Sequence, residues 1–312
     1  MLAPCPSFQV PIGIPIFGVA FTKDNQLLLC GGGGAGRSGV KNKLCSYKVD
    51  IRRKDLEEEA IYELPSDQDA PMCLTIHPTE NVAVAGINTS PDSMKQGNND
   101  NCRCYDIGET EITFKNAVKS MESKQEEDYQ KTVRFNKDGT LLATGTTEGV
   151  VTTFKYPSLE QVSRIQVVEN NDVLDVDMND EGAKLTAVIP DGLKLISLRG
   201  RTAGTVIQTV SASTVHKKHT LQFRSFRYGS GFSENLAFAV ANGIGKSKGG
   251  FLVVLDAHTL EIKKVYQASK TPITAFCLSP DGSLIGYGAA DFSISILEAS
   301  TLRVSSSKRM CY

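Results

Sequence analysis

The sequence has 312 residues, of which 40% are hydrophobic and 22% are charged, a balance typical of a globular protein with a sizeable core. The formal net charge of −1 argues against binding to nucleic acid or to an anionic membrane surface. No run of about 18 apolar residues occurs, so no membrane-spanning helix is predicted. The eight cysteines are scattered without a C-x-x-C pair, which argues against a zinc site and indicates a reducing compartment.

The first predicted elements are two strands, QLLLC and KLCSYKVD, that flank the glycine-rich segment GGGGAGRSGVKNKL at residues 31–44. Gly31, Gly33 and Gly36 match G-x-G-x-x-G, and Arg37 stands where a phosphate loop has lysine. Both nucleotide motifs need a helix after the glycines, because the helix N-terminus supplies the amides that hold the phosphate. A strand-like run follows here, so we expect a long hairpin and no bound nucleotide.

The length and composition of this hairpin favour a binding role. Its glycines allow the backbone to bend sharply and to turn carbonyl oxygens inward, and such oxygens are good ligands for a hard cation. A bound monovalent ion would make the segment rigid. Val40 would then be an apolar tip and Asn42 a polar group at the exit, an arrangement that favours partner binding over catalysis.

A repeat with six copies extends along the chain. The clearest copies, FNKDGTLLATG and LSPDGSLIGYG, each combine an Asp-Gly turn with an apolar strand. The copies are spaced roughly 43 to 59 residues apart, which matches four-stranded propeller blades. We therefore predict an all-β, WD-repeat-like β-propeller that forms a single domain over residues 1–312. The six copies begin at Phe21, Ile76, Phe135, Met178, Phe226 and Leu278.

Some segments depart from this repeat. Residues 107–131 carry dense mixed charge, which predicts an outer strand with a solvated loop or, alternatively, a partner-binding arm. Residues 91–101, PDSMKQGNNDN, predict a flexible polar loop. After Leu302 a short polar tail stands where a seventh blade would begin, and Ser7 to Val10 could add one strand to that blade.

The histidines give little support to an enzyme. His77 precedes a proline in a blade turn, and we expect it to be structural. His216 and His219 form H-x-x-H without a third ligand, and we expect solvated loop histidines. No covalent chemistry is expected, and a plain protein-interaction scaffold is the main alternative to a specialised function.

The glycine segment carries a specific resemblance. Its pattern, GGGG-x-G-x-x-G-[IV]-x-N-K-L in the first blade of a weak propeller, resembles the Sec-twelve family, whose animal members are the prolactin regulatory element-binding proteins. The resemblance extends from the segment IFG at residues 16–18 to the later Asp-Gly turns. It implies seven blades, of which six are visible with the last apparently incomplete. It also implies a guanine-nucleotide exchange factor for the Sar-type small GTPase that starts COPII vesicle budding and protein transport from the endoplasmic reticulum to the Golgi.

The resemblance implies roles for individual residues as well. The family's corresponding loop binds a potassium ion through backbone oxygens, and here that loop runs from Gly31 to Leu44. Asn42 corresponds to an asparagine needed for exchange, and Val40 to an apolar residue that contacts the GTPase. Pro71, in an Asp-Ala-Pro context, would be structural. The glycines that would shape the loop and its ion site are Gly31, Gly32, Gly33, Gly34, Gly36 and Gly39.

Family members act at the cytosolic face of the endoplasmic reticulum and end in a membrane-spanning helix. No such anchor is visible in this sequence, so we expect the last blade and the anchor to be missing and any membrane association to require that anchor. The expected partners are the Sar-type GTPase and the COPII machinery, with no nucleic acid.

Overall fold

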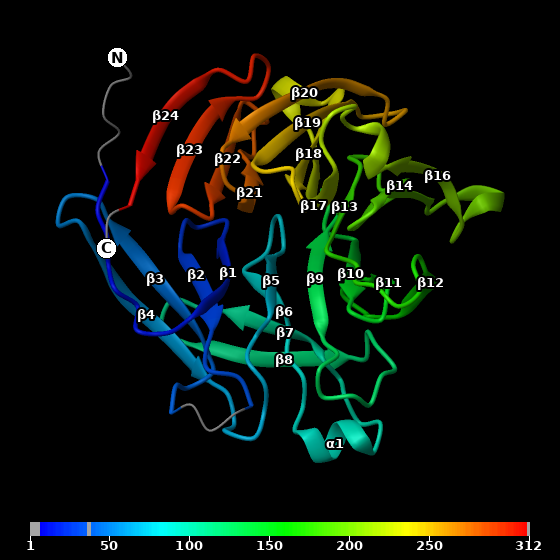
Figure 1. Cartoon of the computed structure of the whole chain (residues 1–312). Helices are drawn as coiled ribbons and strands as arrows, with labels where there is room; N and C mark the ends of the chain where they lie inside the picture. The colour runs from blue at the N-terminus through cyan, green and yellow to red at the C-terminus, as the bar shows by residue number, and fades with distance from the viewer. Residues whose placement is uncertain (1–6, 36–38, 311–312) are drawn as a thin grey trace. The chain divides into compact units, whose positions relative to one another are not determined.

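The computed structural model describes residues 7–35 and 39–310, and these residues form a nearly all-β structure (Figure 1). They form six four-stranded antiparallel sheets, and strands adjacent in the chain are adjacent in each sheet. A repeated meander of this kind is the architecture of a β-propeller, each sheet being one blade. The prediction of an all-β propeller with six visible blades is therefore confirmed.

The chain folds as two compact units, which divide between Val176 and Asp177. The first unit contains three complete blades. Blade one consists of β1 (Ile16–Phe21), β2 (Leu27–Gly31), β3 (Lys43–Asp50) and β4 (Asp55–Glu63). Blade two consists of β5 (Cys73–Ile76), β6 (Val82–Gly86), β7 (Cys102–Ile107) and β8 (Ile112–Val118), with α1 (Pro91–Lys95) between β6 and β7. Blade three consists of β9 (Gln130–Phe135), β10 (Leu141–Thr146), β11 (Val150–Lys155) and β12 (Gln161–Gln166).

The remaining strands belong to blades four to six. Blade four consists of β13 (Asp175–Met178), β14 (Lys184–Ile189), β15 (Gly192–Ser197) and β16 (Val206–Ser211). Blade five consists of β17 (Leu221–Tyr228), β18 (Leu236–Gly243), β19 (Gly250–Asp256) and β20 (Ile262–Ser269). Blade six consists of β21 (Ile273–Leu278), β22 (Leu284–Ala289), β23 (Ser293–Glu298) and β24 (Val304–Arg309).

The repeat in the sequence corresponds to one turn in each blade. Its copies begin at or near the end of the first strand of a blade, and the following turn leads into the second strand. In the two clearest copies the turn glycines, Gly139 and Gly282, have φ angles of +75° and +71°. Residues with a side chain rarely adopt this backbone conformation, so the glycine of each Asp-Gly pair determines where the hairpin turns.

Apolar residues on neighbouring blades form the core of the first unit. Leu28 and Leu44 of blade one pack with Ala85 and Tyr105 of blade two in one buried cluster. The other face of blade two contributes to a second cluster with blade three. Burial of these side chains, at roughly 25 cal/mol per Å² of apolar surface, holds the blades together and gives the loops between strands a rigid base.

The polar segments differ from their predictions in part. Residues 91–101 are not a flexible loop, because they contain α1, whose Met94 is only 2% exposed and whose N-terminus is capped by Ser90. Residues 107–131 form the outer strand β8 and the connection to β9, as one alternative predicted, but Ser120 and Met121 in that connection are buried. No strand occurs at residues 7–10, because this stretch pairs with no neighbouring strand.

Burial of the cysteines leads to a labelling prediction. Five of the six cysteines in the described residues are buried, and Cys277 is exposed. Burial raises the pKa of Cys73 to about 11 and that of Cys104 to about 12, so little thiolate forms near pH 8. We expect iodoacetamide to modify Cys277 rapidly in the native protein and the buried thiols only after denaturation, as measured by peptide mass spectrometry. Native labelling of Cys30 or Cys73 as fast as that of Cys277 would contradict this packing.

Candidate functional site

The glycine-rich segment joins two neighbouring strands of blade one. Gly31 at the end of β2 pairs with Lys43 at the start of β3, so the loop itself comprises residues 32–42, here called the glycine loop. β3 coincides with the predicted strand KLCSYKVD, so Lys43 and Leu44 at the end of the glycine-rich segment are strand residues, as is Gly31 at its start. The hairpin prediction is confirmed, because the strand β3 follows the loop where a phosphate-binding loop requires a helix.

Two glycines at the start of the loop lie too close to other backbone atoms to carry a side chain. A Cβ atom on Gly31 would lie 1.9 Å from the carbonyl oxygen of Pro15. Gly32 donates its N–H to the same oxygen at 3.1 Å, has a φ of +148°, and would place a Cβ 2.2 Å from Asn42 Oδ1. Glycine is therefore required at both positions by close approach of the chain.

The side chain of Asn42 forms hydrogen bonds across the glycine loop. Asn42 is 5% exposed, and its Oδ1 accepts a hydrogen bond from the Gly34 N–H at 3.0 Å. Its Nδ2 donates to the carbonyl oxygens of Gly34 at 3.0 Å and Gln68 at 2.9 Å. Asn42, which was expected to be a polar group at the loop exit, is thus buried. Its side chain provides hydrogen-bond partners for backbone atoms of the same unit.

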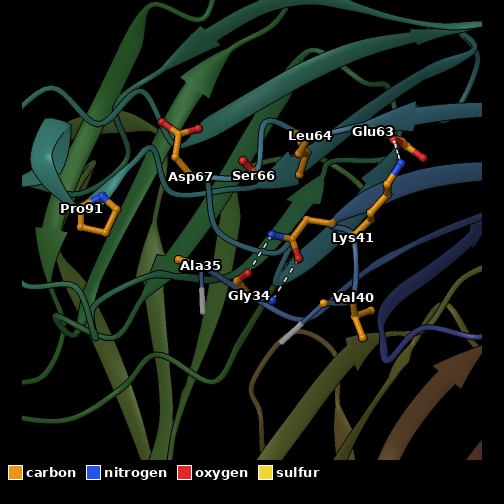
Figure 2. Close-up of a pocket in the computed structure, with 11 residues that line it drawn as sticks. Gly34, Ala35, Val40, Lys41, Glu63, Leu64, Ser66, Asp67 and Pro91 are labelled. Carbon is orange, nitrogen blue, oxygen red and sulfur yellow. Dashed lines mark hydrogen bonds and ion pairs between the residues drawn. The ribbon is translucent and has the colours of Figure 1, made fainter. Parts of the chain in front are cut away.

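A groove lies between the glycine loop and the connection from β4 to β5 (Figure 2). Its volume is about 740 Å³. In Figure 2, Gly34, Ala35 and Val40 lie along one side, with Leu64, Ser66 and Asp67 opposite. The remaining residues that line it are Gly39, Lys41, Asn42, Glu63 and Pro91.

The groove presents both charged and apolar groups. Lys41 and Glu63 form an ion pair of 2.6 Å whose side chains are 70% and 47% exposed, so it contributes little to stability. Val40 is half-buried at the rim. The groove thus combines an accessible apolar side chain with charged neighbours, as protein-binding surfaces do.

The other predicted loop residues occupy varied positions. Gly34 and Gly39 have φ angles of +79° and +76°, and Gly33 is half-buried. Gly36 lies outside the described residues. Pro71 is buried in the connection between β4 and β5, and its carbonyl oxygen accepts from the thiol of Cys30 at 3.6 Å.

Asn42 Oδ1 and the Lys41 carbonyl oxygen both lie close to Gly32. The position of an added Gly32 Cβ would lie 2.2 Å from Asn42 Oδ1 and 2.8 Å from the Lys41 carbonyl oxygen. Backbone carbonyl and amide oxygens are the ligands that monovalent cations prefer. The described residues contain no cluster of three His, Cys, Asp or Glu side chains that could hold a metal ion.

The histidines lie away from the glycine loop in the chain. His77 is buried, and its Nδ1 accepts from the N–H groups of Thr79 and Glu80, at 3.3 and 3.0 Å, within a blade turn. This contact agrees with the structural role expected for it. His216 and His219 are half-buried rather than solvated, with ring centroids 4.6 Å apart.

Within residues 7–35 and 39–310 no helix is long and apolar enough to cross a membrane.

The sequence analysis did not identify Gln68 and Asp69 as site residues. Both belong to the connection between β4 and β5, and both contact the glycine loop. No local motif indicates this contact, because it joins residues 26 to 34 positions apart. The only nearby signal was the Asp-Ala-Pro context of Pro71, which begins at Asp69.

Known proteins with similar sequences were compared with the chain. No protein-family model matches it. The putative guanine nucleotide-exchange factor SED4 of Candida glabrata is 25% identical over 300 residues, which cover 95% of this chain and 28% of SED4. SEC12-like protein 2 of Arabidopsis thaliana is 25% identical over 276 residues, covering 86% of this chain and 64% of that protein. The guanine nucleotide-exchange factor SEC12 of C. glabrata is 26% identical over 190 residues, covering 60% and 41%.

Two of these relatives carry the name SEC12 and two are named guanine nucleotide-exchange factors, and the chain spans less than two thirds of the length of each. The similarity covers nearly the whole chain in two of the three comparisons. The resemblance that the glycine segment suggested is thus found independently along the propeller. Over most of its length the chain is therefore similar in sequence to proteins of the Sec-twelve (SEC12) family.

Proposed function

We propose that the chain is a guanine-nucleotide exchange factor that promotes release of GDP from a small GTPase. The observation that carries the proposal is the glycine loop, which Asn42 fixes beside an open groove of about 740 Å³. A fixed loop at the surface can enter a partner with little ordering cost on binding. The names of the SED4 and SEC12 relatives as exchange factors support the same function.

Exchange of this kind needs no covalent chemistry. A factor that binds the nucleotide-free GTPase more tightly than the GDP-bound form shifts the equilibrium towards GDP release, and GTP then enters. In this proposal Val40 is the apolar group that contacts the GTPase, because it lies at the rim of the groove. Asn42 is buried, so it acts by holding the loop in the shape that presents Val40.

A potassium ion is proposed as an additional support for the loop. The Lys41 carbonyl oxygen and Asn42 Oδ1, which converge near Gly32, would hold it together with backbone carbonyls of the glycine loop. When bound, the ion would neutralise the repulsion between inward-facing oxygens. The described loop residues themselves provide the shape, through the contacts of Gly31, Gly32 and Asn42.

We further propose that the partner is a Sar-type GTPase of the COPII machinery and that the protein works at the cytosolic face of the endoplasmic reticulum. The pattern of the glycine loop and the SEC12 name of its relatives support this assignment. Because the chain spans 28% to 64% of the length of the three relatives, the activity is proposed for this propeller and is to be tested on it directly.

Release of a fluorescent GDP from a Sar-type GTPase tests the proposal. We expect the chain to accelerate release, and more strongly in potassium than in lithium buffer, because lithium is too small for a site built from fixed carbonyl oxygens. A Ras-type GTPase is the specificity control and should show no acceleration. If a folded chain does not accelerate release from the Sar-type GTPase, the exchange function fails and a protein-interaction scaffold remains. Equal rates in the two buffers would reject the ion alone.

A further inference from the structure

The connection between β4 and β5 passes along the glycine loop and contributes hydrogen-bonding groups to it. Residues 64–72 read LPSDQDAPM, a polar stretch without regular structure. Its first residue is fixed to the exit of the glycine loop, because Leu64 donates its N–H to the Asn42 carbonyl oxygen at 2.9 Å. Further along the same connection, towards β5, Gln68 and Asp69 also contact the glycine loop.

Gln68 forms hydrogen bonds with both Asn42 and the buried guanidinium of Arg103. Its backbone carbonyl accepts from Asn42 Nδ2 at 2.9 Å, and its side-chain Oε1 accepts from Arg103 Nη1 at 2.5 Å. Arg103 belongs to β7 and is 8% exposed, and its Nε also donates to the Asp100 carbonyl oxygen at 3.3 Å. A buried guanidinium holds its acceptors strongly, because the alternative is an unpaired charge away from water. Arg103 thus fixes Gln68, and Gln68 fixes Asn42.

Asp69 provides a second connection from the loop. Its Oδ1 accepts from the N–H groups of Ala35 at 3.2 Å and of Ala70 at 2.8 Å. Its own N–H donates to the carbonyl oxygen of Asn88 at 3.2 Å. Asp69 therefore contacts the glycine loop through its carboxylate and the segment that leads into α1 through its backbone N–H.

Asn88 continues this connection to blade three. Its Nδ2 donates to the Asp128 carbonyl oxygen at 2.8 Å, and its Oδ1 accepts from Asn99 at 3.1 Å. Asp128 lies in the connection that enters blade three and accepts from Thr147 Oγ1 at 2.8 Å. Asn88 and Asn99 are 4% and 2% exposed, so the bond between them is shielded from water.

We infer that Gln68 and Asp69 are positioning residues that fix the glycine loop to blades two and three. The glycines give the loop little conformational preference of its own, so bonds from outside the hairpin add to those that Asn42 makes within it. The inference concerns the loop's geometry, and its consequence for exchange rests on the proposed function. Residues 91–101 take part in this support through Asn99, which donates to Asn88 Oδ1.

The test uses Asp69→Ala and Asp69→Asn in the full chain, with Asp55→Ala as a matched control at the exposed start of β4. Amide hydrogen exchange at Ala35 reports the bond directly and does not depend on any GTPase. We expect Asp69→Ala to speed Ala35 exchange and to reduce stimulated GDP release, each about tenfold. Asparagine retains an acceptor oxygen, so Asp69→Asn should restore most of both, and Asp55→Ala should change neither.

Gln68→Ala is the second variant, because it removes the acceptor of Arg103 and should speed amide exchange at Gly34, the partner of Asn42 Oδ1. Unchanged protection of Gly34 and Ala35 in the alanine variants would overturn the inference. Failure of Asp69→Asn to rescue Asp69→Ala would also overturn it, because the charge rather than the hydrogen bond would then matter. If the parent chain does not accelerate GDP release, the proposed function fails, and hydrogen exchange still decides whether these residues fix the loop.

Discussion

Replacing Asn42 with alanine is expected to reduce stimulated GDP release by roughly 100-fold while leaving the propeller folded. The substitution removes three side-chain hydrogen bonds and leaves the N–H and carbonyl of Gly34 and the carbonyl of Gln68 without this partner. Each such bond contributes about 1 kcal/mol, and about 1.4 kcal/mol corresponds to a tenfold change in an equilibrium. The loop would then sample many shapes, of which few present Val40 to the GTPase.

The assay compares fluorescent GDP release with the parent chain, with Asn42→Ala and with Asn116→Ala. Asn116 lies in β8, and its Oδ1 is buried with no hydrogen-bond partner among the described residues, so its replacement should leave release unchanged. Circular dichroism and urea unfolding verify that both variants are folded. Full activity of a folded Asn42→Ala protein would refute the role of the closed loop in exchange.

Replacing Gly31 with alanine is expected to lower the free energy of unfolding by about 3 kcal/mol and to abolish exchange. The new Cβ would lie 1.9 Å from the Pro15 carbonyl oxygen, 2.9 Å from its carbonyl carbon and 3.1 Å from Ile16 Cα. All three are backbone atoms, so no side-chain rotation can relieve the overlap. The start of β1 must separate from the end of β2, which also displaces Gly32 from the Pro15 oxygen to which it donates.

Gly288→Ala is a matched control for this substitution. Gly288 also lies in the second strand of a blade, but a Cβ there would meet only the Ala275 Cβ, at an ordinary 3.7 Å. We expect urea unfolding to shift by less than about 1 kcal/mol for Gly288→Ala. Equal destabilisation by both substitutions would mean that the close approach of Pro15 to Gly31 is not what makes glycine necessary.

The propeller was predictable because its signals are local and repeated. An Asp-Gly pair followed by an apolar run indicates a hairpin wherever it occurs, and Gly139 and Gly282 adopt the positive φ angles that this requires. The segment at residues 91–101 was not predictable in the same way. Its polar composition indicates a flexible loop, whereas burial of Met94 and of Asn99 fixes it.

Within the glycine loop, too, some features could be predicted from the sequence and others could not. Its position between two strands and its glycine pattern were visible in the sequence, and the family resemblance followed from them. The burial of Asn42 was not visible, since a polar residue at a loop exit is more often exposed. Its partners include Gln68, 26 residues away, and the bond exists only because blade two brings the connecting segment beside the loop.

The six repeated blades, the hairpin that carries the glycines and the resemblance to the Sec-twelve family could therefore be predicted from the sequence. Strand alternation, turn residues and a short motif encode these features, and each depends on residues close together in the chain. Only the tertiary structure decided how the glycine loop is held. Its contacts with Gln68 and Asp69, and their support by Arg103 and Asn88, join segments that packing of the blades alone brings together.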